Sequence, residues 1–325
     1  MRTPFTRFDR RILIGATLVL LALALVAAAV LLARSSSSAS PTTSNPGAPD
    51  AASRRSTASL NAYEGLGSWV DLYDTPAWRD PKAAVKDMAK HGVKTIYVQT
   101  ANDGSSSGIV HPKALRTFIT QAHARHMYVV AWYLPSLGAG STDYDRVMEA
   151  IRFTTQDGQT FDSFALDIES TDVKSERVRN ARLAALSAKI RDCVGSDYAL
   201  GAIIPSPVAL DKRLGYWDDF PYSDVARLYD VILPMGYYTF HVHGGAATYA
   251  ETVSNVQILR TKPGCSSIPV HLIGGLAEKS STSEVKQFVR RVAETGCIGG
   301  SLYGWPGTSG AAWRELAAIK GGGGR

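Results

Sequence analysis

The sequence lacks the motifs that mark several common classes of enzyme. No Walker or dinucleotide phosphate-binding turn occurs, and the segment after the first expected strand reads DLYDTPAWRD instead. Cysteine and histidine do not recur at metal-ligand spacing, since His241 and His243 form an isolated His-x-His with no third ligand evident. We therefore expect neither a bound nucleotide nor a metal, and no other cofactor.

A basic surface of the kind that binds nucleic acid is also missing from most of the chain. The formal charge of the 325 residues is +6. Residues 1–60 contribute +5, from seven arginines and two aspartates, and the remainder holds 28 basic and 27 acidic residues. Because the excess belongs to the N-terminal segment, we do not expect the main domain to bind nucleic acid.

Cysteine is scarce in this chain. Cys193, Cys265 and Cys297 each fall just before an expected strand. An odd number leaves at least one thiol without an intramolecular partner. Two interpretations stay open, one disulfide in an exported domain or three small buried side chains.

One long uncharged run stands near the N-terminus. Ile12–Ala33 holds 22 residues without a charge, enough to cross the roughly 30 Å hydrocarbon core of a bilayer. Four arginines precede this run and only Arg34 follows closely, which predicts that residues 1–11 are cytoplasmic and the rest lies outside. The alternative is a cleaved signal peptide, although its apolar region is normally shorter. Both interpretations export the main domain.

The rest of the chain divides into a linker, one large domain and a short tail. Residues 34–60 are rich in Ser, Thr, Pro and Ala, which predicts a disordered linker, and residues 321–325 form a Gly-rich tail. Between them, in residues 61–320, short β-rich runs alternate with amphipathic helical stretches. Eight such units predict a (β/α)8 TIM barrel, and we expect a monomer. The expected strands are Gly67–Tyr73, Thr95–Thr100, Tyr128–Leu134, Ser163–Glu169, Ala199–Pro205, Val231–Tyr237, Val270–Gly274 and Gly300–Trp305.

Alternation along the strands predicts which side chains enter the barrel. In the fourth run, Phe164, Leu166 and Ile168 form an apolar face that should meet the helices, so Asp167 and Glu169 point inward. They lie at the C-terminal end of the strand, where the active sites of such barrels are built. Strand parity predicts that one mouth of the barrel is lined by Asp71, Gln99, Asp167, Glu169, Tyr237 and Trp305.

Asp167 and Glu169 are the candidate catalytic pair. Two carboxyl groups two residues apart on one strand repel each other as anions, which should raise the pKa of one of them. A carboxyl with a raised pKa is what general-acid catalysis near neutral pH requires. A buried structural pair is the alternative, but the position at a strand end among aromatic residues favours catalysis.

The run DSFALDIE, from Asp162 to Glu169, resembles a degenerate form of the DGxDxDxE motif of glycoside hydrolase family 18, the chitinase and endo-N-acetylglucosaminidase family. Met235, Tyr237 and Trp305 are similar to residues of that family on the sixth and eighth strands. The resemblance implies that Glu169 protonates the glycosidic oxygen and that Asp167 orients the 2-acetamido group of the substrate. Ala165 stands where the family has its middle Asp, and Ser163 where it has Gly.

A second resemblance, carried by Asp71 and the Asp-x-Glu ending of the fourth strand, is to the lysozyme-type muramidases of family 25. Both resemblances imply hydrolysis of an N-acetylated glycan, chitin-like or peptidoglycan, without a cofactor. The Ala165 departure motivates an alternative from another class, a catalytically weak barrel that binds glycan or senses the cell wall.

Aromatic residues near the strand ends support a saccharide cleft, because sugar rings stack their C–H faces on aromatic planes. The aromatic set comprises Trp69, Tyr73, Trp132, Tyr133, Tyr237, Tyr238 and Trp305. A tyrosine at the rim can also donate a hydrogen bond to an oxygen that gains charge. Besides the catalytic candidates Glu169, Asp167 and Tyr237, the predicted substrate-binding residues are Asp71, Tyr73, Gln99, Tyr133, Met235 and Trp305.

Overall fold

The computed structural model describes residues 58–212 and 215–321. Within these ranges no helix is both long enough and apolar enough to span a membrane. The predicted anchor Ile12–Ala33, the cytoplasmic segment 1–11, most of the predicted linker and residues 322–325 lie outside the described residues. These four assignments stay predictions.

The predicted barrel is confirmed. Eight parallel strands pair in sequence order, and β1 closes the sheet by pairing with β8 through Gly65 and Leu66. The strands are β1 (Gly65–Val70), β2 (Thr95–Asn102), β3 (Tyr128–Leu134), β4 (Ser163–Asp167), β5 (Leu200–Pro205), β6 (Val231–Met235), β7 (His271–Leu276) and β8 (Gly299–Tyr303).

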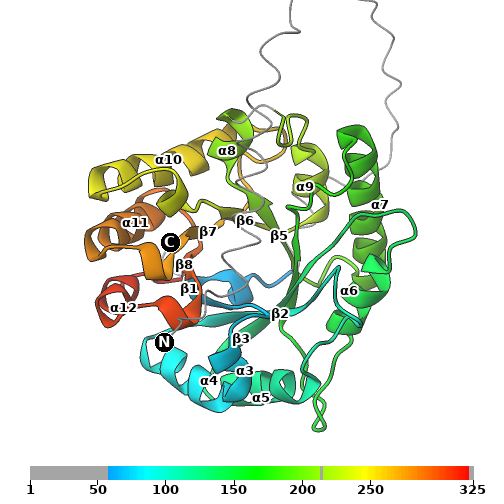
Figure 1. Cartoon of the computed structure of the whole chain (residues 1–325), viewed down its shortest axis with the longest axis horizontal. Helices are drawn as coiled ribbons and strands as arrows, with labels where there is room; N and C mark the ends of the chain where they lie inside the picture. Colours follow the sequence, from blue (N-terminus) through cyan, green and yellow to red (C-terminus); the bar gives the residue numbers. More distant parts are fainter. Residues whose placement is uncertain (1–57, 213–214, 322–325) are drawn as a thin grey trace, which may run out of the picture. The chain divides into compact units, whose positions relative to one another are not determined.

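Helices surround this barrel on all sides (Figure 1). Among the described helices the longest is α7 (Glu176–Val194), and α10 (Gly245–Thr261) and α11 (Thr282–Glu294) cover the β6–β8 side. The others are α3 (Thr75–Arg79), α4 (Pro81–Lys90), α5 (Pro112–His123), α6 (Asp143–Ile151), α8 (Pro207–Lys212), α9 (Tyr222–Leu228) and α12 (Gly310–Leu316). Short 3-10 turns are η1 (Asn61–Tyr63), η2 (Tyr238–Phe240), η3 (Ala277–Lys279) and η4 (Trp305–Gly307).

The core has an inner and an outer layer, as strand parity predicted. Val98 of β2 and Leu166 of β4 belong to the outer cluster between strands and helices. Tyr97 and Ala165, one position away on the same strands, belong to the inner cluster inside the barrel. Because both faces of every strand are covered, the strands are apolar almost throughout.

The N-terminal end of the barrel is closed by η1. The Tyr63 side chain is fully buried in the inner cluster, and its hydroxyl donates to the Phe164 carbonyl at 2.9 Å and lies 2.7 Å from Ser163 Oγ. Ala58 is also buried in this cluster. Ala58 thus contacts the barrel although it belongs to the predicted linker, and the boundary of the linker stays a prediction.

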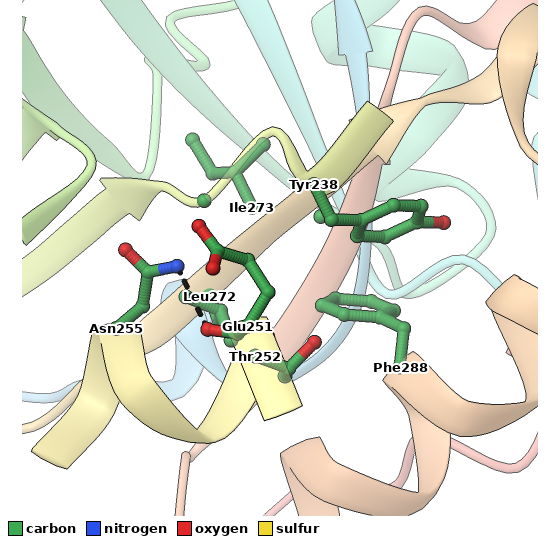
Figure 2. Close-up of a pocket in the computed structure, with 9 residues that line it drawn as sticks. Tyr238, Glu251, Thr252, Asn255, Leu272, Ile273 and Phe288 are labelled. Carbon is green, nitrogen blue, oxygen red and sulfur yellow. Dashed lines mark hydrogen bonds between the residues drawn. The ribbon is translucent and has the colours of Figure 1, made fainter. Parts of the chain in front are cut away.

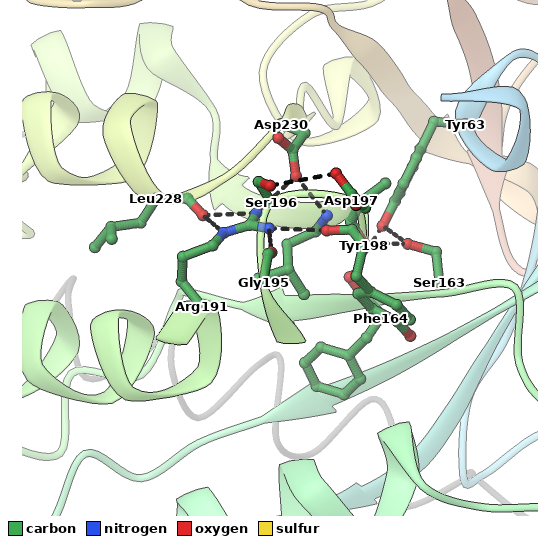
Figure 3. A network of polar contacts seen from close by, with 12 residues as sticks. Tyr63, Ser163, Phe164, Arg191, Gly195, Ser196, Asp197, Tyr198, Leu228 and Asp230 are labelled. Atoms are coloured by element: carbon green, nitrogen blue, oxygen red, sulfur yellow. Dashed lines mark hydrogen bonds and ion pairs between the residues drawn. The ribbon is translucent and has the colours of Figure 1, made fainter. Parts of the chain in front are cut away.

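A buried ion pair joins α7 to the start of β6 at the same end (Figure 3). Arg191 Nη2 lies 2.6 Å from Asp230 Oδ2, and the guanidinium also donates to the carbonyls of Leu228, Gly195 and Tyr198. Asp230 Oδ2 accepts a second bond from the Leu200 backbone at 2.8 Å. The network ties one helix to two neighbouring strands.

Several strands end earlier at the mouth than predicted. β4 ends at Asp167, β6 at Met235 and β8 at Tyr303. After β8 the chain turns at Gly304, whose φ of 91° is readily adopted only by glycine. Residues beyond these points lie in turns, so alternation within the strand no longer fixes their direction.

No disulfide joins Cys193, Cys265 and Cys297 in the described part of the chain, so the first interpretation left open by the sequence is wrong and the second, three buried side chains, holds only in part. Cys265 is buried, Cys297 is partly buried and Cys193 is exposed. Burial raises the pKa of the Cys297 thiol to about 11. The domain as described is therefore held without a disulfide.

Candidate active site

The candidate carboxyl pair lies at the mouth of the barrel. Asp167 is the last residue of β4 and follows the parity of Ala165, which places it inside, with only 5% of its surface exposed. Glu169 comes two residues later, beyond the strand, and is partly buried. The predicted order, with Asp167 deeper than Glu169, matches these positions.

Burial dominates the electrostatics of this pair. It raises the pKa of Asp167 well above the usual range of an aspartate, and the nearby Glu169 carboxylate raises it further. Burial also raises the pKa of Glu169. Since each site influences the other, the pair titrates as a unit and favours retaining a proton. The deeper Asp167 competes with Glu169 for that proton, whereas the sequence predicted a raised pKa for one of the two groups.

Ala165 provides no hydrogen bond to Asp167. The alanine is fully buried in the inner cluster and offers no polar group to its neighbour on the same face. Asp167 Oδ1 is buried and has no hydrogen-bond partner among the residues that the structure describes. A buried carboxylate without partners is costly, which adds to the preference of Asp167 for its neutral form.

Tyr237, two residues beyond the end of β6, meets this pair at the mouth. Burial is the main cause that raises the pKa of Tyr237 well above its usual range, followed by the charges of Glu169, Asp167 and Asp71. The phenol therefore lies within electrostatic reach of three carboxyl groups. Its backbone has a φ of 29°, which is unfavourable for a non-glycine residue and is found most often at functional sites. Met235, two residues earlier, is buried in the inner cluster.

Asp71 forms a second acidic group across the mouth. Its Oδ1 accepts from the Tyr73 backbone at 2.7 Å, and its backbone N–H donates to Asp74 Oδ2 at 3.0 Å. Burial raises the pKa of Asp71, and burial together with the Asp71 charge raises the pKa of Asp74 to about 8. Glu278 of η3 contributes to both shifts. Sequence analysis identified Asp71 but missed Asp74 and Glu278, since both follow their strands in turns.

Tyr303 is the main residue that the sequence analysis missed. Its hydroxyl donates to Asp71 Oδ2 at 2.9 Å, and its ring meets that of Tyr237 edge to face at 5.8 Å. Tyr303 therefore connects the Asp71 group to the phenol next to Asp167. The signal was present, because the alternation in β8 places Tyr303 on the inner face.

Two further predicted residues surround Asp71. Gln99 is buried, and its Oε1 accepts from the Leu72 backbone at 3.1 Å, so it supports the turn that carries Asp71. Tyr73 is 45% exposed and lies at the surface beyond the strand. Gln99 thus holds the turn after β1 in place. The ring of Tyr73 is accessible to a ligand at the surface.

The predictions for Tyr133 and Trp305 are wrong about position. Tyr133 is fully buried in the outer cluster, where its hydroxyl donates to Asp143 of α6 at 2.7 Å. Trp305 opens η4 and packs against the outer cluster, with its indole N–H donating to Asp87 of α4 at 3.0 Å. Both side chains therefore face helices and not the mouth.

The other aromatic residues predicted to line the rim of the cleft are buried inside the domain. Trp69 is buried in the inner cluster, stacks on Tyr97 at 4.3 Å and donates from its indole to Ser301 Oγ at 2.8 Å. Trp132 lies beside it, with ring centroids 5.9 Å apart. Tyr238 is buried in the outer cluster near Phe288.

Two hollows lie apart from the carboxyl pair. A cavity of about 10 Å³, room for about one water molecule, lies among Glu251, Asn255 and Phe288 (Figure 2). His241 Nδ1 lies 3.1 Å from Glu251 Oε1, so the histidine is bound to a helix residue. A hollow of about 260 Å³ lies between α6 and α7, where Tyr144 and Arg182 contribute to its lining. Tyr238 lines the smaller cavity, but neither hollow is lined by a residue predicted to be catalytic or to bind substrate.

Comparison with known proteins gives structural matches but no sequence match. No family model and no curated protein matches the sequence. The endo-β-1,4-mannanase from Thermotoga petrophila has a TM-score of 0.57 at 10% identity, covering 75% of this chain and 68% of that one.

Two further structures match over nearly their whole length. The family 18 chitinase from Cycas revoluta has a TM-score of 0.54 at 10% identity, covering 78% of this chain and 98% of that one. The PgaB (BpsB) glycoside hydrolase domain from Bordetella bronchiseptica has a TM-score of 0.52 at 12% identity, covering 79% and 99%. The structural neighbours are glycoside hydrolase barrels, and at these identities the likeness establishes the shared fold.

Proposed function

We propose that the domain is a glycoside hydrolase in which Glu169 is the general acid and Asp167 its partner. The observation that carries the proposal is the convergence of Asp167, Glu169 and Tyr237 at one mouth of the barrel. Burial raises the pKa of both carboxyl groups, and a raised pKa favours the protonated form from which a general acid donates to a leaving oxygen.

The substrate class follows from the resemblance of the fourth strand to family 18. Asp167, next to the proton donor, is positioned to orient the acetamido group of an N-acetylated glycan, chitin-like or peptidoglycan. The structural similarity to the family 18 chitinase from Cycas revoluta supports this choice. The similarity to the mannanase favours a substrate without acetamido groups. The chemistry of the carboxyl pair is compatible with both.

A glycan-binding module with weak catalysis is the second candidate, and Ala165 favours it. In glycoside hydrolase family 18, which the fourth strand resembles, the middle Asp of the DGxDxDxE motif helps the next Asp to change its charge. With alanine here, Asp167 Oδ1 lacks a hydrogen-bond partner among the described residues, and a neutral Asp167 would stabilise a cationic intermediate poorly.

We further propose that Ile12–Ala33 anchors the protein in a membrane with the barrel outside. The support is the arginine asymmetry around this run. Protease added to intact cells should release the barrel by cutting within residues 34–57, because a linker of this composition offers accessible sites. Full protection of the barrel in intact cells, with cleavage only after lysis, would contradict the proposed orientation.

The test of the proposed activity is a glycan panel. The full-length protein is incubated with chitin oligomers, peptidoglycan, mannan oligomers and neutral glucans, and new reducing ends are measured. Release from N-acetylated glycans is the expected result. Binding without release, equal in wild type and Glu169→Gln, would support the binding module instead.

A further inference from the structure

Among the buried polar atoms that lack a hydrogen-bond partner in the described residues, two lie on the inner faces of the adjacent strands β3 and β4. The indole Nε1 of Trp132 and Oδ1 of Asp167 have no hydrogen-bond partner among residues 58–212 and 215–321. The two side chains are 4% and 5% exposed. Burying a donor or acceptor unpaired is unfavourable, so native proteins seldom keep such groups without a purpose.

The two atoms belong to adjacent strands and one face. Trp132 of β3 pairs with Ala165 of β4, and both belong to the inner cluster. Asp167 lies two positions further along β4, on the same face and nearer the mouth. An indole is long enough to reach a diagonal neighbour at this separation. One of the two atoms is a donor and the other is an acceptor when ionised.

A neighbouring tryptophan provides an internal comparison. Trp69 lies in the same cluster, with its ring 5.9 Å from that of Trp132. Its indole N–H donates to Ser301 Oγ at 2.8 Å. Of the two similar indoles in the interior, that of Trp69 makes a hydrogen bond within the fold. The N–H of Trp132 is available for an acceptor that the described residues do not supply.

Tyrosines lie above these atoms. Tyr237 and Tyr303 are partly buried and pack against the inner cluster from the mouth side. A ligand that enters from the mouth therefore meets these tyrosines on its way to Asp167. Tyr237 also has a backbone φ of 29°, which is unfavourable for a non-glycine residue.

We propose that Trp132 is a substrate-positioning residue whose indole N–H donates to a hydroxyl oxygen of the innermost sugar, while that hydroxyl donates to Asp167. The inference rests on the proposed function and adds to it a residue that neither resemblance implies. The position requires a group that both accepts and donates, as a hydroxyl does. A carboxylate offers Asp167 Oδ1 no donor, and an ammonium group offers the indole no acceptor.

The test compares Trp132→Phe with Trp69→Phe, both in a Glu169→Gln background that prevents turnover. Each change removes an indole N–H and the same ring volume, so the pair separates a ligand contact from a contact within the fold. Titration with the glycan that the panel identifies gives the dissociation constant, and thermal unfolding without glycan gives Tm.

Trp132→Phe should raise the dissociation constant about 3- to 10-fold, the equivalent of one hydrogen bond. It should lower Tm less than Trp69→Phe, which should leave the dissociation constant within about 2-fold. An unchanged dissociation constant for Trp132→Phe would overturn the inference while leaving the proposed function intact. Equal losses of Tm with unchanged affinity would show that the N–H serves an internal water. If the parent protein binds no glycan, the proposed function fails and the inference fails with it.

Discussion

The hydroxyl of Tyr303 donates to Oδ2 of Asp71 at 2.9 Å, joining the end of β8 to the turn after β1. These are the two strands that close the barrel. The bond lowers the pKa of Asp71, while burial, the larger cause, raises it. One contact thus links closure of the fold to the charge of a group at the mouth.

Tyr303→Phe should destabilise the protein by about 1–2 kcal/mol, because it removes a donor from a buried carboxyl group. The loss should be larger at pH 9 than at pH 4, since a hydrogen bond to an ionised carboxylate is the stronger one. Thermal unfolding at both pH values measures this. Tyr222→Phe is the matched control, because the buried Tyr222 hydroxyl has no hydrogen-bond partner in the described part of the chain. Equal behaviour of the two variants would contradict the role given to Tyr303.

His271 makes the stability of the barrel depend on pH. The imidazole is fully buried, with Nδ1 2.8 Å from the Tyr63 carbonyl oxygen and Nε2 3.1 Å from Ser301 Oγ. Burial lowers its pKa from 6.5 to about 4. Because the folded-state pKa lies below the unfolded value, the unfolded chain takes up the proton first. Stability should therefore fall as the pH drops from about 6.5 to about 4.

The contribution of this histidine is at most about 3 kcal/mol, from the size of the pKa difference. His271→Gln should remove that part of the pH dependence, although it lowers stability at pH 7 through lost hydrogen bonds. Urea unfolding of both proteins at pH 7 and pH 4 gives the comparison. If the variant loses as much stability between these pH values as wild type, His271 is not the titrating group.

The Arg191–Asp230 pair should be essential for folding (Figure 3). Arg191→Met leaves the Asp230 carboxylate buried without its cation, and breaking a buried pair in this way costs about 3–5 kcal/mol. Arg290→Met is the control, because Arg290 pairs with Glu294 at the surface of α11 and should matter little. Chemical denaturation measures both. A small loss for Arg191→Met would show that the bonds to Asp230 from backbone groups suffice.

Alternation of side chains was enough to predict the barrel and the position of Asp167. Along β4 and the residue that follows it, the apolar residues Phe164, Leu166 and Ile168 stand at every second position, so only one register buries them all against helices. The carboxyl of Asp167 is then inside by necessity. Shortly after the ends of α4, α7, α10 and α11 the chain has a glycine with positive φ, namely Gly92, Gly195, Gly264 and Gly296.

The wrong predictions concern side chains whose direction the alternation of apolar and polar residues does not determine. The β3 sequence YVVAWYL is apolar on both faces, so nothing in it distinguishes the outward Tyr133 from the inward Trp132. Trp305 follows the turn at Gly304, and the direction of a side chain beyond a turn depends on tertiary contacts such as its bond to Asp87. Asp74 and Glu278 belong to turns of the same kind.

The most direct test of the central claim is the turnover of Glu169→Gln on the glycan that wild type cleaves fastest. General-acid catalysis typically contributes about 10²- to 10⁴-fold, so the variant should be slower by that order while still binding the glycan. Asp172→Asn, a change in an exposed carboxyl group three residues away, should retain the wild-type rate. Wild-type turnover in a correctly folded Glu169→Gln variant would contradict the assignment of Glu169 as the acid.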